Sequence, residues 1–61
     1  MKKKLLEKQL RECGWRFSRH GGGHDIWTNG EIHEPVPRHS EIGESLAKKI
    51  LKKAKNNRPK E

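Results

Sequence analysis

The stretch RHGGGHDIWTNGEIHEPVPRH, residues 19–39, contains the two turn signals that decide the fold. It holds all four histidines of the chain, four of its six glycines and two of its three prolines. The Gly21–Gly23 triplet predicts one turn, and Asn29-Gly30 predicts a second, because type I′ hairpin turns need positive φ at both central residues. Between and around these turns, apolar alternation predicts three short strands, at residues 15–20, 24–28 and 31–36.

Helical periodicity lies on both sides of this stretch. Residues 2–13 place apolar side chains at helical spacing with charged residues between them, and Gly14 is positioned to end that helix. The same spacing returns from about residue 40 to residue 55, with Ser40 predicted as the N-cap. We therefore expect an α+β fold in the order α-β-β-β-α, with both helices on one face of a three-stranded antiparallel sheet.

The composition limits the chain to one small domain with an external site. Sixty-one residues, 28% of them hydrophobic, bury one thin core and leave no room for an internal substrate pocket. The domain is expected over residues 1–55, followed by a polar tail over residues 56–61. The net charge of +7 favours a polyanion or an acidic partner. A single cysteine and the lack of any long apolar run indicate a cytoplasmic protein without a membrane span.

The two turns also predict which side chains share a face of the sheet. A three-residue glycine loop places His20 opposite His24, and a two-residue Asn29-Gly30 turn places Ile26 opposite His33. A glycine loop longer by one residue would reverse the faces of the first strand. The helix-facing side is then apolar, with Trp15, Phe17, Trp27, Ile32 and Val36. The other side, called the open face below, is predicted to carry Arg16, Ser18, His20, His24, Ile26, Thr28 and His33.

The open face offers histidines that can act as a general base. An unperturbed imidazole has a pKa of about 6.5, so its neutral form can take the proton of a ribose 2′-hydroxyl. His24 is the best candidate, because it follows glycines whose missing side chains let a phosphate backbone approach. The backbone N–H groups of Gly22 and Gly23 could bind that phosphate. His20 is expected to face His24, whereas Asp25 should point to the other side of the sheet. Each histidine can also be an ordinary solvated residue without a function.

Basic residues near this face are candidates for contacting RNA phosphates. They are Arg16 and His20 on the open face, Arg38 and His39 after the prolines, and Lys48 and Lys49 near the start of the second helix. The lysines can equally form a solvated helix face. The sequence has no zinc-type spacing of cysteine and histidine, no P-loop and no activated nucleophile, so neither a metal nor a cofactor is expected.

Several of these motifs together resemble the HicA toxins of bacterial HicA–HicB toxin–antitoxin pairs. The resemblance spans residues 5–54 and lies in GW (14–15), GGGHDIWTNG (21–30), VPRH (36–39) and ESLAKKILKKA (44–54). It implies a fold like that of double-stranded-RNA-binding domains, an mRNA interferase activity with His24 as the catalytic residue, and a HicB-type antitoxin that blocks His24. The family often has Gly-Ser-His at this turn, whereas Gly23 precedes the histidine here. The resemblance does not identify the group that protonates the leaving 5′-oxygen.

Three functions are therefore open at the level of sequence. The leading one is a metal-independent endoribonuclease toxin, monomeric when alone, whose third strand leaves an edge for a partner. The second is a non-catalytic RNA-binding module of the same fold, in which the lysine helix contacts phosphates. The third is an interaction domain for an acidic protein. Binding across about 16 base pairs of double-stranded RNA would need a longer helical face than this chain offers.

Overall fold

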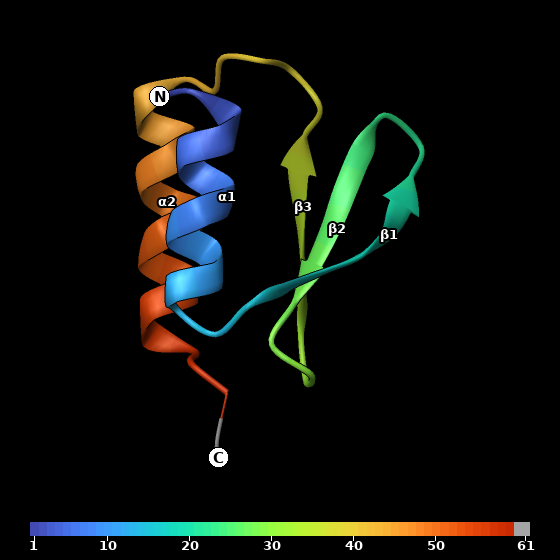
Figure 1. The fold of residues 1–61 in the computed structure, drawn as a ribbon, viewed down its shortest axis with the longest axis vertical. Helices are drawn as coiled ribbons and strands as arrows, with labels where there is room; N and C mark the ends of the chain where they lie inside the picture. The colour runs from blue at the N-terminus through green and yellow to red at the C-terminus, as the bar shows by residue number, and fades with distance from the viewer. Residues whose placement is uncertain (60–61) are drawn as a thin grey trace.

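The computed structural model describes residues 1–59 and has the predicted order of elements (Figure 1). The three strands form one antiparallel sheet in the order β1-β2-β3. The two helices lie side by side and run in the same direction, and β1 is the strand farthest from them. The elements are α1 (Lys3–Glu12), β1 (Arg16–Gly21), β2 (His24–Thr28), β3 (His33–Pro37) and α2 (Glu44–Asn56).

One apolar core lies between the helices and the sheet, as the periodicity predicts. Trp27 and Val36 contribute from the sheet and are fully buried. Cys13 belongs to this core as a small apolar side chain. The remaining core residues are Leu6, Leu10, Trp15, Ile42, Ala47, Ile50, Leu51 and Ala54. Phe17, which was also expected in the core, is 42% exposed, although its cross-strand partner Trp27 is fully buried; β1 is the edge strand on the side of the sheet away from the helices.

The start of α2 differs from the prediction. Its N-cap is Gly43, so Ser40 as the N-cap is wrong. The reason is that the segment before α2 pairs with the chain before α1 in an extended conformation. The Lys3 backbone N–H donates to the Ser40 oxygen at 2.9 Å, and Lys2 forms an isolated bridge with Glu41. This pairing fixes the beginning of α1 beside the β3–α2 connection.

The end of the described chain packs back onto the domain. The Asn57 carbonyl accepts hydrogen bonds from Trp15 Nε1 at 3.2 Å and from Asn29 Nδ2 at 2.6 Å. The predicted tail over residues 56–61 therefore begins inside α2 and then contacts two loops. Its last two residues lie outside the described part of the chain.

The glycine turn is shorter than the predicted three-residue loop. Gly21 pairs with His24, so only Gly22 and Gly23 form the turn. His20 therefore lies opposite Asp25, and the prediction that it faces His24 is wrong. Because side chains alternate along a strand, this change of one residue moves His20 to the helix-facing side of the sheet.

A β-bulge then returns β1 to the predicted register. Phe17 pairs with Trp27 as expected, but Arg19 pairs with Ile26, which leaves Ser18 as the extra residue. Before the bulge, Arg16 and Phe17 lie on the faces predicted for them. After the bulge, the side chains from Arg19 onward lie on the faces opposite to the predicted ones. Arg19 therefore takes the place on the open face that the prediction gave to Ser18.

The second turn is longer than the predicted two-residue turn, without any change of faces. Thr28 pairs with His33, so residues 29–32 form the connection. The Asn29 side chain holds it, because its Oδ1 accepts the N–H groups of Glu31 and Ile32 at 2.8 and 2.9 Å. The register moves by two residues relative to the prediction, and an even shift leaves His33 on the open face.

Candidate functional site

His24 is the first residue of β2 and is exposed on the open face. Its neighbours across the sheet are Gly21 on β1 and Pro37 on β3. The His24 backbone N–H donates to the Gly22 oxygen at 2.7 Å, which fixes the turn directly before it. A Cβ added at Gly22 or Gly23 would meet nothing within 4 Å. The imidazole therefore stands at an unobstructed turn that a large ligand can reach from the face and from the tip.

Two arginines of β1 share the open face with His24. Arg16 pairs with Thr28 and Arg19 pairs with Ile26, and both arginines are exposed. Arg16 was predicted as a phosphate contact, whereas Arg19 was missed. Only the register of the bulged strand places Arg19 here, and the glycine triplet alone does not reveal it.

His20 lies on the other side of the hairpin, together with Asp25. Its Nδ1 is 2.8 Å from Asp25 Oδ1, and the two residues are direct cross-strand partners. Asp25 is buried, with 4% of its surface exposed, and its Oδ2 accepts a hydrogen bond from Lys3 Nζ at 2.7 Å. Arg38 Nε lies 3.6 Å from Asp25 Oδ1. Asp25 thus points away from His24, as strand alternation predicts, and joins His20, Lys3 and Arg38 in one cluster.

The charges within this cluster reinforce each other. The hydrogen bond from Lys3 holds the pKa of Asp25 below its ordinary value of 3.8. Burial raises the pKa of Asp25, and the hydrogen bond with His20 lowers it further. The same hydrogen bond to Asp25 raises the pKa of Lys3 above its ordinary value of 10.5. Burial of Lys3 lowers this pKa, whereas Glu7, whose Oε2 is 3.0 Å from Lys3 Nζ, raises it. Asp25 is therefore an ionised carboxylate at neutral pH and can only accept hydrogen bonds. His20 Nδ1 must carry the proton of their hydrogen bond, and the His20 side chain is 66% exposed.

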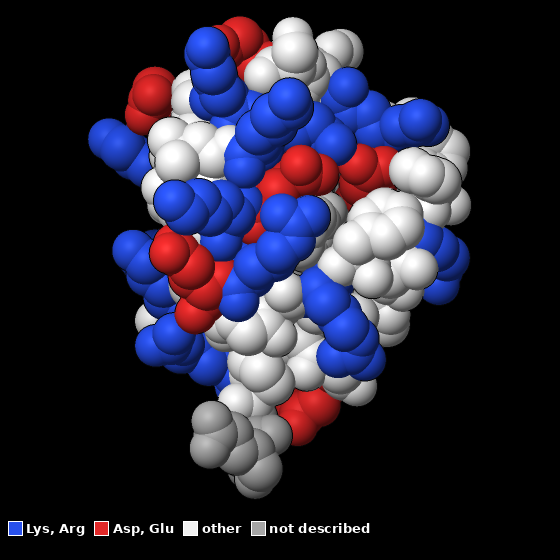
Figure 2. Space-filling view, in the orientation of Figure 1, with Lys and Arg blue, Asp and Glu red and all other residues white. Residues whose placement is uncertain are grey.

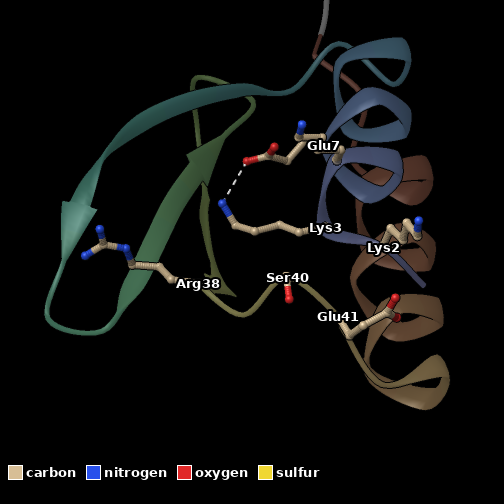
Figure 3. Close-up of a pocket in the computed structure, with 7 residues that line it drawn as sticks. Lys2, Lys3, Glu7, Arg38, Ser40 and Glu41 are labelled. Atoms are coloured by element: carbon tan, nitrogen blue, oxygen red, sulfur yellow. Dashed lines mark hydrogen bonds and ion pairs between the residues drawn. The ribbon is translucent and has the colours of Figure 1, made fainter.

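Arg38 lines a shallow hollow beside the start of α1 (Figure 3). In this view Lys3 and Glu7 extend from α1 toward the sheet, and Arg38 extends from the segment after β3. The hollow has a volume of about 650 Å³. Its lining is Lys2, Lys3, Lys4, Glu7, Arg38, Ser40 and Glu41. Arg38 is thus placed with His20 through Asp25, on the side of the sheet opposite to the imidazole of His24.

The remaining predicted RNA contacts lie in other elements. His39 is exposed in the connection between β3 and α2, two residues after Pro37, which is the cross-strand partner of His24. Lys48 and Lys49 are exposed on α2, in the helix layer, so the sheet lies between them and the open face. Figure 2 shows lysine and arginine side chains spread over the helices and the top of the molecule, with acidic side chains among them. On this face the basic side chains are spread widely and do not by themselves select a site.

Two other features are absent from residues 1–59: a membrane-spanning helix and a metal-binding group of side chains. Neither helix there has the length and apolar character needed to cross a membrane. Within the same residues, no three side chains of histidine, cysteine, aspartate and glutamate are grouped so as to hold a metal ion.

The fold and the glycine turn with its histidine agree with the resemblance found in the motifs. The family profile described as "HicA toxin of bacterial toxin-antitoxin" matches residues 4–55. The chain belongs to the HicA toxin family. HicA toxins are mRNA interferases of toxin–antitoxin systems, so an antitoxin is the partner that the family implies for this HicA chain. Comparison with curated proteins and with solved structures finds no match.

Proposed function

We propose that this HicA chain is a metal-independent endoribonuclease that cleaves mRNA in the cytoplasm, with His24 as the general base. The single observation that carries the proposal is the place of His24, an exposed imidazole at an open glycine turn. Membership of the HicA family supports the choice of mRNA as substrate. The domain over residues 1–55 is proposed to act as a monomer when it is free of its antitoxin.

The reaction requires little of the protein, because RNA supplies both the nucleophile and the leaving group. Neutral His24 takes the proton of a ribose 2′-hydroxyl, and the 2′-oxygen attacks the adjacent phosphorus. The bond to the 5′-oxygen breaks, and that oxygen leaves with a proton. The products are a 2′,3′-cyclic phosphate and a 5′-hydroxyl end. Arg16 and Arg19, on the same face, can bind the neighbouring phosphates, and the backbone of Gly22 and Gly23 gives the strand room to approach.

The test compares His24→Gln with His33→Gln in RNA cleavage. Chemical synthesis of the 61-residue chain excludes contaminating host ribonucleases. Loss of a positioned general base lowers the rate by about 10²–10⁴-fold, so His24→Gln should lose that much activity and keep its fold. His33 is exposed on the same face and serves as the matched control. Cleavage should persist in EDTA and leave 2′,3′-cyclic phosphate ends.

The alternative of a non-catalytic RNA-binding module makes the opposite prediction. Wild-type protein would then bind RNA without cutting it, and His24→Gln would bind equally well. Equal cleavage by the wild type and His24→Gln would show that another residue is the base. Either result would reject the proposed role of His24.

We also propose that the HicB-type antitoxin covers the open face around His24. The unobstructed glycine turn and the free edge of β3 give a partner both an imidazole to bury and a strand to pair with. Diethyl pyrocarbonate should modify His24 in the free toxin and leave it unmodified in the complex. Equal modification of His24 in both states would contradict this.

A further inference from the structure

The proposed cleavage leaves one role unfilled, which is the proton donor for the leaving 5′-oxygen. We infer that His20, held by Asp25 on the opposite side of the glycine turn from His24, is this general acid. The inference rests on the proposed ribonuclease function and adds a second catalytic imidazole to it. It depends on a contact that the sequence did not predict, because His20 was expected to face His24.

The surroundings of His20 suit a proton donor. Its Nδ1–H donates a hydrogen bond to Asp25 Oδ1 at 2.8 Å, which fixes the orientation of the ring. Asp25 is itself held by Lys3 at 2.7 Å within the fold, so the carboxylate is fixed in place and stays charged. The Phe17 ring packs against the imidazole, with 5.0 Å between the ring centroids. The histidine side chain is nevertheless 66% exposed, which leaves Nε2–H available to a substrate.

The placement on opposite sides of the hairpin agrees with the geometry of the reaction. In a displacement at phosphorus, the attacking and the leaving oxygens lie roughly in line, on opposite sides of the phosphorus atom. A base and an acid must therefore approach the phosphate from opposite directions. His24 lies on the open face and His20 on the helix-facing side, with the turn of Gly22 and Gly23 between them. In the inferred complex, an RNA strand crosses this turn so that one imidazole approaches its phosphate from each side.

The proton balance of the step is complete with these two residues. His24 accepts the proton of the 2′-hydroxyl as the new bond from the 2′-oxygen to phosphorus forms. His20 Nε2–H gives its proton to the 5′-oxygen as the old bond breaks. The step ends with His24 cationic and His20 neutral, and exchange with water restores both. Arg38, 3.6 Å from the same Asp25, adds a cation on the side where the leaving strand departs.

A leaving group that needs no protonation provides the test. The cleavage site is first mapped on a long transcript, and the same short RNA is then synthesised with oxygen or with sulfur as the bridging 5′-atom. His20→Gln should cut the oxygen substrate about 10²-fold or more slowly than the wild type. On the sulfur substrate it should recover to within a few-fold of the wild type, because a thiolate leaves without a proton. His24→Gln should stay slow on both substrates, since each still needs a base.

Controls separate catalysis from folding. His20 is exposed and its glutamine can still donate to Asp25, so circular dichroism and thermal unfolding should match the wild type. Asp25→Asn should show the same sulfur rescue with a smaller defect, as expected for a positioning residue. His33→Gln should behave as wild type on both substrates.

Three results would overturn the inference. His20→Gln could cut the oxygen substrate at the wild-type rate, or it could be equally slow on both substrates, which would indicate phosphate binding only. Alternatively the wild type could fail to cleave any RNA, in which case the proposed function fails as well. The first two results leave the ribonuclease proposal and His24 intact, so the two failures are distinguishable.

Discussion

His20 and His24 flank the same glycine turn, but different parts of the structure hold them. His24 owes its position to the backbone of the turn, and the hydrogen bonds of the described residues give its side chain no partner. His20 is held by a buried carboxylate that α1 supplies with a lysine. One hairpin tip therefore presents an exposed imidazole on one face and an imidazole anchored to a buried carboxylate on the other. Substitutions can test each half of this contrast.

The largest expected effect on stability lies on the anchored side. Asp25→Ala leaves Lys3 without its closest acid partner in a partly buried site, and loss of one member of a buried ion pair costs about 3 kcal/mol. Substitution of the residue before it, His24→Ala, should change the free energy of unfolding by less than about 0.5 kcal/mol, because His24 is exposed. Urea unfolding followed by tryptophan fluorescence measures both variants. Equal stability of the two would remove the contrast between the faces.

A somewhat smaller effect is expected from acid. The pKa of Asp25 is lower in the folded chain than its ordinary value of 3.8, so the unfolded state binds this proton first as the pH falls. Asp25 therefore contributes its full stabilisation above about pH 5, and the contribution is lost as the pH drops through and below 3.8. Urea midpoints between about pH 6 and pH 2 should fall less steeply for Asp25→Asn than for the wild type. Parallel curves for the two proteins would contradict the folded-state charge of Asp25.

The smallest expected effect concerns RNA affinity on the free side. Arg19→Gln removes one cation from the open face and should weaken RNA binding a few-fold, with the slope of log affinity against log salt reduced by about 0.7 for single strands. Lys8→Gln removes the same charge from the solvent side of α1 and serves as the control. Binding of a non-cleavable 2′-deoxy oligonucleotide at several salt concentrations measures this. An identical loss for both variants would mean that only net charge matters.

The turns show which register errors matter for function. The second turn moved the pairing by two residues relative to the sequence prediction, and every side chain of β3 kept its predicted face. The glycine turn differed by one residue, so His20 moved to the helix-facing side and Arg19 took the place predicted for Ser18 on the open face. Three consecutive glycines provide no side chain that distinguishes a two-residue from a three-residue turn, so local chemistry could not decide this register.

The sequence by itself determined what depends on local periodicity and local turn chemistry. It predicted the order of elements, most of the buried face of each helix, the end of α1 at Gly14, and the place of His24 on the open face; Leu5 and Leu46, expected on the buried faces, are exposed. The tertiary structure alone decided the partner of His20. The Asp25 carboxylate is stabilised in the interior chiefly because Lys3, 22 positions away in the chain, lies within hydrogen-bond distance once α1 packs beside the sheet. That long-range ion pair, together with the bulge at Ser18, set which imidazole stands free and which is held.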